Sequence, residues 1–250
     1  MIKFFRKIRY NLMEQNKTGK YFKYAIGEIV LVVIGILIAL QINTWNETRK
    51  NKAKEMKILI NLKADLTTTK NNLINVNEEY LKLVRKHDGI LNFIAFDHNE
   101  ISESMKDSMR YTGVPLTRIV DGGINALLNS DKLDLITSDS LTLLLTEYPS
   151  YVESFKEQEK TMENVLITHH RPILIRHVVL MDILSRNNRF PKLKNRVPTS
   201  DYPGLIRDRA YQNAIYDERA QTLNSQSRSY SLLLKTEKLI DLISKQLKGN

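Results

Sequence analysis

A largely apolar run of nineteen residues near the N-terminus constrains this chain more than any other feature. It extends from Tyr24 to Ile42, reads YAIGEIVLVVIGILIALQI, and has Glu28 and Gln41 as its only strongly polar side chains. As a helix, at about 1.5 Å per residue, it nearly covers the roughly 30 Å hydrocarbon core of a bilayer. The sequence therefore predicts a transmembrane helix at residues 24–46, with Trp45 as its interfacial anchor. A cleaved signal peptide is disfavoured, because no A-x-A-like site follows Ala39.

The charges that flank this run indicate how it is oriented. Residues 1–23 carry seven Lys or Arg side chains, and five more follow between residues 49 and 57. Because cytoplasmic flanks are the richer in Lys and Arg, we expect a cytoplasmic N-terminus in the bacterial inner membrane and a periplasmic domain at residues 47–250. Residues 1–23 are interpreted either as a basic amphipathic helix on an anionic leaflet or as a topogenic tail.

The body of the chain begins with a heptad pattern. Apolar residues recur in alternating steps of three and four after the span, and no Gly or Pro occurs there before Gly89. This pattern predicts a long helix at 47–94, packed along one stripe as in a coiled coil. Either it continues the transmembrane helix without a break or it starts afresh near Asn51. The seam comprises Leu59, Leu62, Leu66, Leu73, Val76, Tyr80 and Leu83, with Thr69 and His87 at its gaps.

The rest of the chain is also predicted to be helical, because no segment shows sustained strand alternation. Middle helices are expected at 102–184, with Pro149 kinking or restarting one of them. A loop is expected at 187–204, which holds three prolines, followed by a C-terminal helix at 205–248 with Tyr230 on its apolar face. The predicted fold class is all-α, with one transmembrane helix and a long-helix bundle outside the membrane.

Composition excludes several kinds of chemistry. The chain has no Cys, so it has neither a disulfide framework, thiolate catalysis nor a Cys-ligated metal. His169, His170 and His177 lack the spacing of a zinc site and are interpreted as surface or core residues. No serine stands in a G-x-S-x-G elbow, and Gly122-Gly123 lacks a nucleotide-binding frame. We therefore predict neither an enzyme nor a bound cofactor or metal.

Two surfaces are candidates for contacts with other molecules. On the span, Gly35 and Ala39 form a small-xxx-small pair beside Glu28 and Val32, which suits close packing of two membrane helices. Glu28 either snorkels toward the headgroups or faces a neighbouring helix. The other surface is a basic stretch that suits either a docking site or a solvated face. Its residues are Arg186, Arg189, Lys192, Lys194 and Arg196.

The opening MIKFFRKIR, followed by KYAIGEIVLVVIGILIALQINTWNE, resembles the N-terminal signature of an uncharacterised family of single-pass bacterial membrane proteins. The stretch LLNSDKLDLITSDSLTLLL is similar to a second patch of that family. The resemblance implies an inner-membrane protein with a helical extramembrane domain, and it implies no activity or site residue.

The preferred hypothesis is a membrane-anchored helical scaffold or assembly protein. Its expected partners are the lipid bilayer, further copies of the same chain, and a protein in the membrane or periplasm, but not nucleic acid. One alternative is a periplasmic ligand sensor that relies on a partner for output, because residues 1–23 are too short for an output domain. Another is an oligomeric pore lined by the transmembrane helix.

Overall fold

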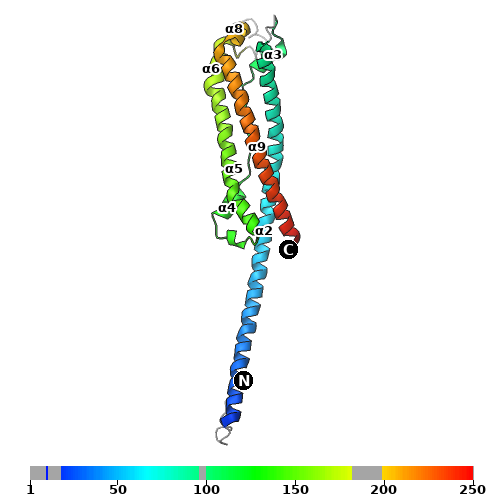
Figure 1. Cartoon of the computed structure of the whole chain (residues 1–250), viewed down its shortest axis with the longest axis vertical. Helices are drawn as coiled ribbons and strands as arrows, with labels where there is room; N and C mark the ends of the chain where they lie inside the picture. Colours follow the sequence, from blue (N-terminus) through cyan, green and yellow to red (C-terminus); the bar gives the residue numbers. More distant parts are fainter. Residues whose placement is uncertain (1–9, 11–17, 96–99, 182–198, 250) are drawn as a thin grey trace. The chain divides into compact units, whose positions relative to one another are not determined.

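The computed structural model describes residue 10 and residues 18–95, 100–181 and 199–249, and all regular elements within these ranges are helices (Figure 1). The predicted all-α class is therefore confirmed. The predicted amphipathic segment lies largely outside the described residues. The chain divides into two compact units, Met1–Lys57 and Ile58–Asn250, which are described separately below.

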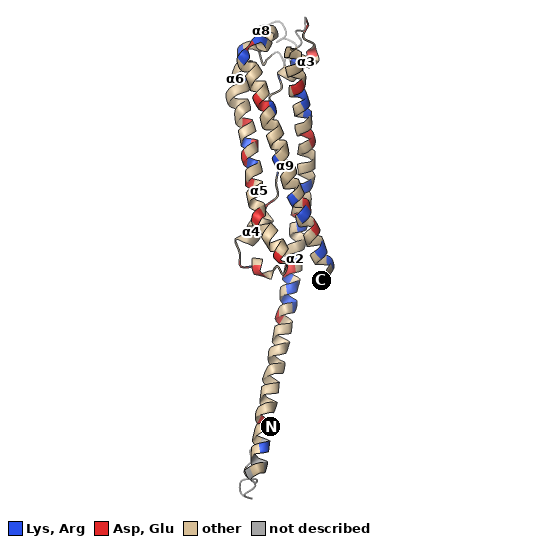
Figure 2. Cartoon of the chain, viewed as in Figure 1, with Lys and Arg blue, Asp and Glu red and all other residues tan. Residues whose placement is uncertain are grey.

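Helix α2 (Thr18–Ala95) supplies the described structure of the first unit. It contains a segment that is long and apolar enough to span a membrane, and none of that segment is buried. Figure 2 shows that no charged residue interrupts α2 between Glu28 and Glu47. The helix has no break at residue 47 or near Asn51, because from there to Gly89 the sequence holds no helix-breaking residue.

Within the second unit, residues 58–95 of α2 lie beside α5 (Asp139–Val165) and α9 (Arg209–Gly249) (Figure 1). Tyr80 of α2 donates a hydrogen bond to Glu159 of α5. Asn77 of α2 donates one to Ser229 of α9 at 3.1 Å. These helices enclose the main core, to which α2 contributes its heptad seam. The seam residues Leu59, Leu62, Leu66, Leu73, Val76, Tyr80 and Leu83 are all buried, as are Thr69 and His87.

Helix α9 differs from its expected pattern. Leu233 and Ile243 are buried as the apolar periodicity suggests, but Tyr230 is 57% exposed. The buried face of α9 instead includes small polar residues, which fit against larger side chains from α2 and α5. Those small polar residues are Thr222, Ser225, Ser229 and Thr236.

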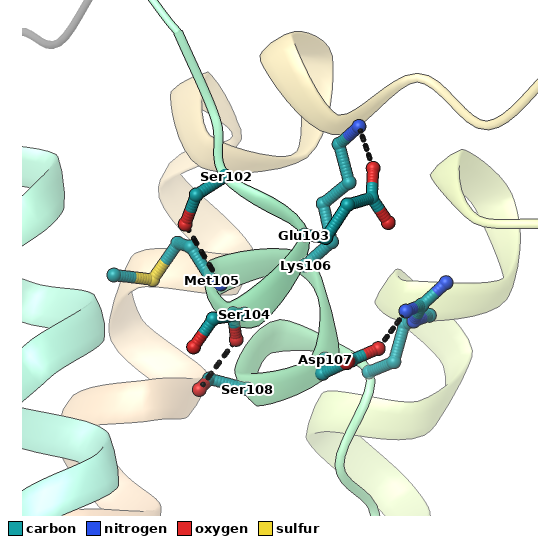
Figure 3. A network of polar contacts seen from close by, with 8 residues as sticks. Ser102, Glu103, Ser104, Met105, Lys106, Asp107 and Ser108 are labelled. Atoms are coloured by element: carbon teal, nitrogen blue, oxygen red, sulfur yellow. Dashed lines mark hydrogen bonds and ion pairs between the residues drawn. The ribbon is translucent and has the colours of Figure 1, made fainter.

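Short helices connect the long ones. Helix α3 (Glu103–Met109) begins where the Ser102 hydroxyl accepts a hydrogen bond from the Met105 amide, and a Glu103–Lys106 ion pair crosses its first turn (Figure 3). Helix α4 (Gly122–Leu128) and the 3₁₀ turn η1 (Leu133–Leu135) precede α5. Two bonds between Thr69 and Val120 fasten the segment before α4 to α2.

Helix α5 continues through Pro149 without restarting. A proline inside a helix removes one hydrogen bond and costs about 3 kcal/mol, but burial of Leu145, Tyr148 and Val152 around it favours the intact helix. The chain then enters η2 (Leu166–His170), a π-helical segment, and α6 (Arg171–His177).

The boundary before α9 also differs from expectation. Helix α8 (Tyr202–Arg207) occupies part of the predicted loop, and α9 starts only at Arg209. The Asp201 carboxylate caps α8 by accepting from the Gly204 amide, and Pro203 stands in the first turn, where its missing N–H is harmless. Asp208 in turn accepts from the Ala210 amide at the start of α9.

Candidate functional site: a buried histidine and glutamate cluster

The apolar core of the second unit is divided in two by ionisable residues. One cluster of buried apolar residues includes the seam of α2 as far as Tyr80, and the other begins at Ile90. Between them lie His87 of α2, His170 of η2 and Glu218 of α9, all at most 5% exposed. Buried ionisable side chains are rare unless they are paired, so this layer is the candidate site.

The two histidines contact opposite oxygens of one carboxylate. His170 Nδ1 lies 2.7 Å from Glu218 Oε1, and His87 Nε2 lies 3.2 Å from Glu218 Oε2. Burial raises the pKa of Glu218, but the hydrogen bonds from His170 and His87 together outweigh it and hold this pKa below its ordinary value of 4.5. The cluster therefore contains a buried glutamate anion.

The hydrogen bonds also favour one arrangement of protons. The second ring nitrogens, His87 Nδ1 and His170 Nε2, are buried and have no hydrogen-bond partner among the described residues. A proton on either nitrogen would be a buried donor without an acceptor, which costs about 1–3 kcal/mol. The tautomers in which His87 Nε2 and His170 Nδ1 each donate a proton to Glu218 satisfy these contacts best.

Helices α2, α5 and α9 and the segment η2 surround the cluster. The π-helical turn of η2 presents His170 inward, and its ring meets Tyr211 of α9 edge-on at 5.4 Å between centroids. Tyr211 Oη is buried without a partner among the described residues, and burial raises the pKa of this phenol. Beside the cluster lies a small cavity lined by His87, Glu218 and Thr222. Its volume is about 10 Å³, which is room for about one water molecule.

A second glutamate is buried in the main core. Glu159 Oε1 accepts hydrogen bonds from Tyr80 Oη at 3.0 Å and from the Thr117 amide at 2.9 Å. Burial raises the pKa of Glu159, although these hydrogen bonds oppose the shift. Glu218 and Glu159 thus differ, because Glu218 has two imidazole donors and Glu159 has a phenol and one amide.

His177 and His169 have local roles. His177 Nε2 lies 3.1 Å from Asp208 Oδ2, which joins α6 to the cap of α9, and this contact together with the Ala210 amide lowers the pKa of Asp208. His169 is exposed and lies 3.6 Å from an oxygen of Asp217. Within the part of the chain that the structure describes, no group of histidine and acidic residues is arranged to hold a metal ion.

The residues predicted from the sequence fall into three groups. Those of the span all lie on α2, where Val32 and Trp45 are exposed and Glu28 is half-buried. The seam residues from Leu59 to Tyr80 line the main core, and Leu83 lines the small cavity beside the histidine and glutamate cluster. The predicted docking patch, which comprises Arg186, Arg189, Lys192, Lys194 and Arg196, lies outside the described residues.

Sequence reasoning missed the buried glutamates. His87 occupies a gap in the apolar seam of α2, and a histidine in such a position requires a polar partner. That signal indicates a buried acceptor. It does not identify Glu218, which lies 131 positions along the chain.

Comparisons with other proteins give one match. Searches of curated proteins and of solved structures found no match. The predicted resemblance to an uncharacterised family is confirmed for a segment that covers most of α2 and reaches into α3, whereas residues 127–145, interpreted as a second patch, lie outside it. Residues 28–108 of this chain match the model of DUF6090, a family of unknown function.

Proposed function

We propose that this protein is a membrane-anchored helical scaffold that acts through self-association and contacts with protein partners. Its anchor is the segment of α2 at residues 24–46 in the bacterial inner membrane. The larger number of Lys and Arg residues before the segment supports a cytoplasmic location for residues 1–23 and a periplasmic location for residues 47–250.

The observation that carries the proposal is the exposure of the apolar segment of α2. Leaving a large aliphatic side chain in water costs about 1.5–3 kcal/mol relative to burying it, and twelve stand between residues 26 and 42. A surface of this kind requires a bilayer or other helices around it. The exposed side chains are Ile26, Ile29, Val30, Leu31, Val32, Val33, Ile34, Ile36, Leu37, Ile38, Leu40 and Ile42.

The ends and one face of this segment support anchoring and association. Trp45 suits the membrane interface, and the Arg49 guanidinium lies 5.9 Å from its ring centroid. A Cβ at Gly35 would meet nothing within 4 Å, so the chain's own fold does not require this glycine. With Ala39 it leaves room for a second membrane helix beside Glu28 and Val32.

Membrane extraction and protease accessibility test the anchor. We expect the full chain to stay in the membrane fraction through carbonate washing and to leave it only with detergent. In spheroplasts, added protease should digest residues 47–250 and spare a tag at the N-terminus. Release by carbonate would contradict the anchor, and digestion of the tag alone would contradict the orientation.

Amine crosslinking in intact membranes tests self-association. The parent chain should yield dimers or larger species, and Gly35→Leu should reduce their yield several-fold by separating the helices. Glu28→Gln should preserve assembly better than Glu28→Leu, because the amide can still form hydrogen bonds. Val30→Leu, which places the same side chain on another face of the helix, is the control. A parent chain that forms neither oligomers nor crosslinks to another protein would contradict the proposal.

A further inference from the structure

Helix α9 carries a second heptad seam on the face opposite the core. Residues along this face recur in alternating steps of four and three over nearly five helical turns, and none is charged. Knobs-into-holes packing of two helices requires this spacing. The outer seam of α9 comprises Tyr216, Ala220, Leu223, Ser227, Tyr230 and Leu234.

The core of the second unit does not use the outer seam. Its four large residues, Tyr216, Leu223, Tyr230 and Leu234, are 66%, 37%, 57% and 50% exposed. Exposed apolar residues on a monomer are normally scattered singly, whereas these align along one helix. The charged residue nearest the middle of the seam, Arg228, turns away from it to bond Ser154 of α5. The centre of the seam therefore lacks charge, as the buried centre of a protein interface does.

Helix α2 widens this surface. Ile74 and Leu81 are 38% and 45% exposed and stand seven residues apart. Asp88, another seven residues along the same stripe, forms an ion pair with Arg219, so this stripe borders α9. Because α2 and α9 run antiparallel with Asn77 bonded to Ser229, Ile74 lies level with the turn between Tyr230 and Leu234. By the same register Leu81 lies level with Ser225, about half a turn from Leu223.

We propose that a second copy of this chain docks on the outer seam of α9 together with Ile74 and Leu81 of α2. The inference rests on the proposed function, because it assigns the proposed self-association to one surface of the second unit. A two-fold axis parallel to the two copies of α9 brings residues of equal height together, and the same surface serves both copies.

The available area suits a stable pair. With about 200 Å² for a fully exposed large side chain, the six exposed fractions amount to roughly 600 Å² per copy. Two copies would bury about 1,200 Å², the lower limit for stable protein interfaces.

Cysteine crosslinking tests the surface directly, because the chain has no native Cys. In isolated membranes oxidised with copper phenanthroline, Tyr230→Cys should form a disulfide-linked dimer. Ser150→Cys, at an exposed site on α5, should give at least fivefold less. Adding Leu223→Glu to Tyr230→Cys should reduce the dimer at least fivefold. Adding Leu143→Glu, the same change at the 62% exposed Leu143 of α5, should leave it unchanged. Circular dichroism verifies that each variant keeps its helix content.

The outcomes separate this inference from the proposed function. If the parent chain forms oligomers but Tyr230→Cys crosslinks no better than Ser150→Cys, the outer seam is not the interface and self-association stands. A Tyr230→Cys product of another mass shows that a different protein covers the seam, which overturns the inference. If neither the parent chain nor Tyr230→Cys forms a crosslinked species, both proposals fail.

Discussion

Two helices of the same bundle, α2 and α9, differ in the side chains that the middle of each helix buries. The inward stripe of α2 is mostly leucine, with Tyr80 and His87 included. The inward stripe of α9 includes Glu218, Thr222, Ser225 and Ser229, each at most 5% exposed, whereas its outward stripe holds exposed tyrosine and leucine. Apolar periodicity therefore identifies the buried face of α2 correctly and places Tyr230 of α9 on the wrong face.

The physical reason is complementary size. Tyr80 and Tyr148 are fully buried and extend toward the neighbouring helices. Tyr148 Oη lies 2.9 Å from Thr236 Oγ1, and the Ser225 hydroxyl lies 3.6 Å from Met162 Sδ. Small residues on α9 leave room for these large ones, and their hydroxyls are satisfied by hydrogen bonds. The hydroxyls of Thr222 and Thr236, for example, also donate to carbonyls one turn back.

The largest effect on stability is expected from a substitution in the apolar seam of α2. Leu66→Ala removes a fully buried side chain from the α2 seam and should lower the free energy of unfolding by about 2–5 kcal/mol. Ile60→Ala, at a residue on α2 that is 55% exposed, should change it by less than ~0.5 kcal/mol. Denaturant unfolding of the full chain in detergent, followed by circular dichroism, measures both. Equal losses would contradict the assignment of the two faces of α2.

A smaller effect on stability is expected from a substitution among the small polar residues on the buried face of α9. Ser225→Leu places a large side chain where Ser225 is fully buried beside Met162 and should destabilise the bundle by about 1–3 kcal/mol through overpacking. Asn224→Leu, at the next and exposed position, should be nearly neutral. The same unfolding measurement applies. If Ser225→Leu stabilised the protein, small residues on α9 would mark a poorly filled core, not a close fit.

These differences show how far the sequence specifies the fold. The all-α class, the apolar segment and the seam from Leu59 to Leu83 follow from residues near one another in the chain. The candidate site does not. Its members, His87, His170 and Glu218, come from three elements, and only the antiparallel register of α2 and α9 brings the first and last together. Helix α9 shows two apolar stripes, and periodicity cannot tell which one is buried.

The smallest expected effect concerns Glu159 and Glu218, whose pKa values lie on opposite sides of the ordinary 4.5. The pKa of Glu218 is lowered, so below pH 4.5 the unfolded chain binds more protons at this residue. Stability from Glu218 is therefore fully present above pH 4.5 and is lost as pH falls through its folded pKa. The pKa of Glu159 is raised, so just above pH 4.5 the folded chain binds the extra proton. Stability from Glu159 therefore falls as pH rises toward its folded pKa.

Variants with the neutral amide separate the two contributions. Glu159→Gln keeps an oxygen for Tyr80 and the Thr117 amide, so its stability near pH 4.5 should lie within ~1 kcal/mol of the parent chain. Its free energy of unfolding should lack the decline above pH 4.5, whereas Glu218→Gln should lack the loss below that pH. Unfolding curves between pH 3 and 7 measure these slopes for the parent chain and both variants. If both variants altered the slope in the same pH range and direction, the imidazole donors of Glu218 would not distinguish it from Glu159.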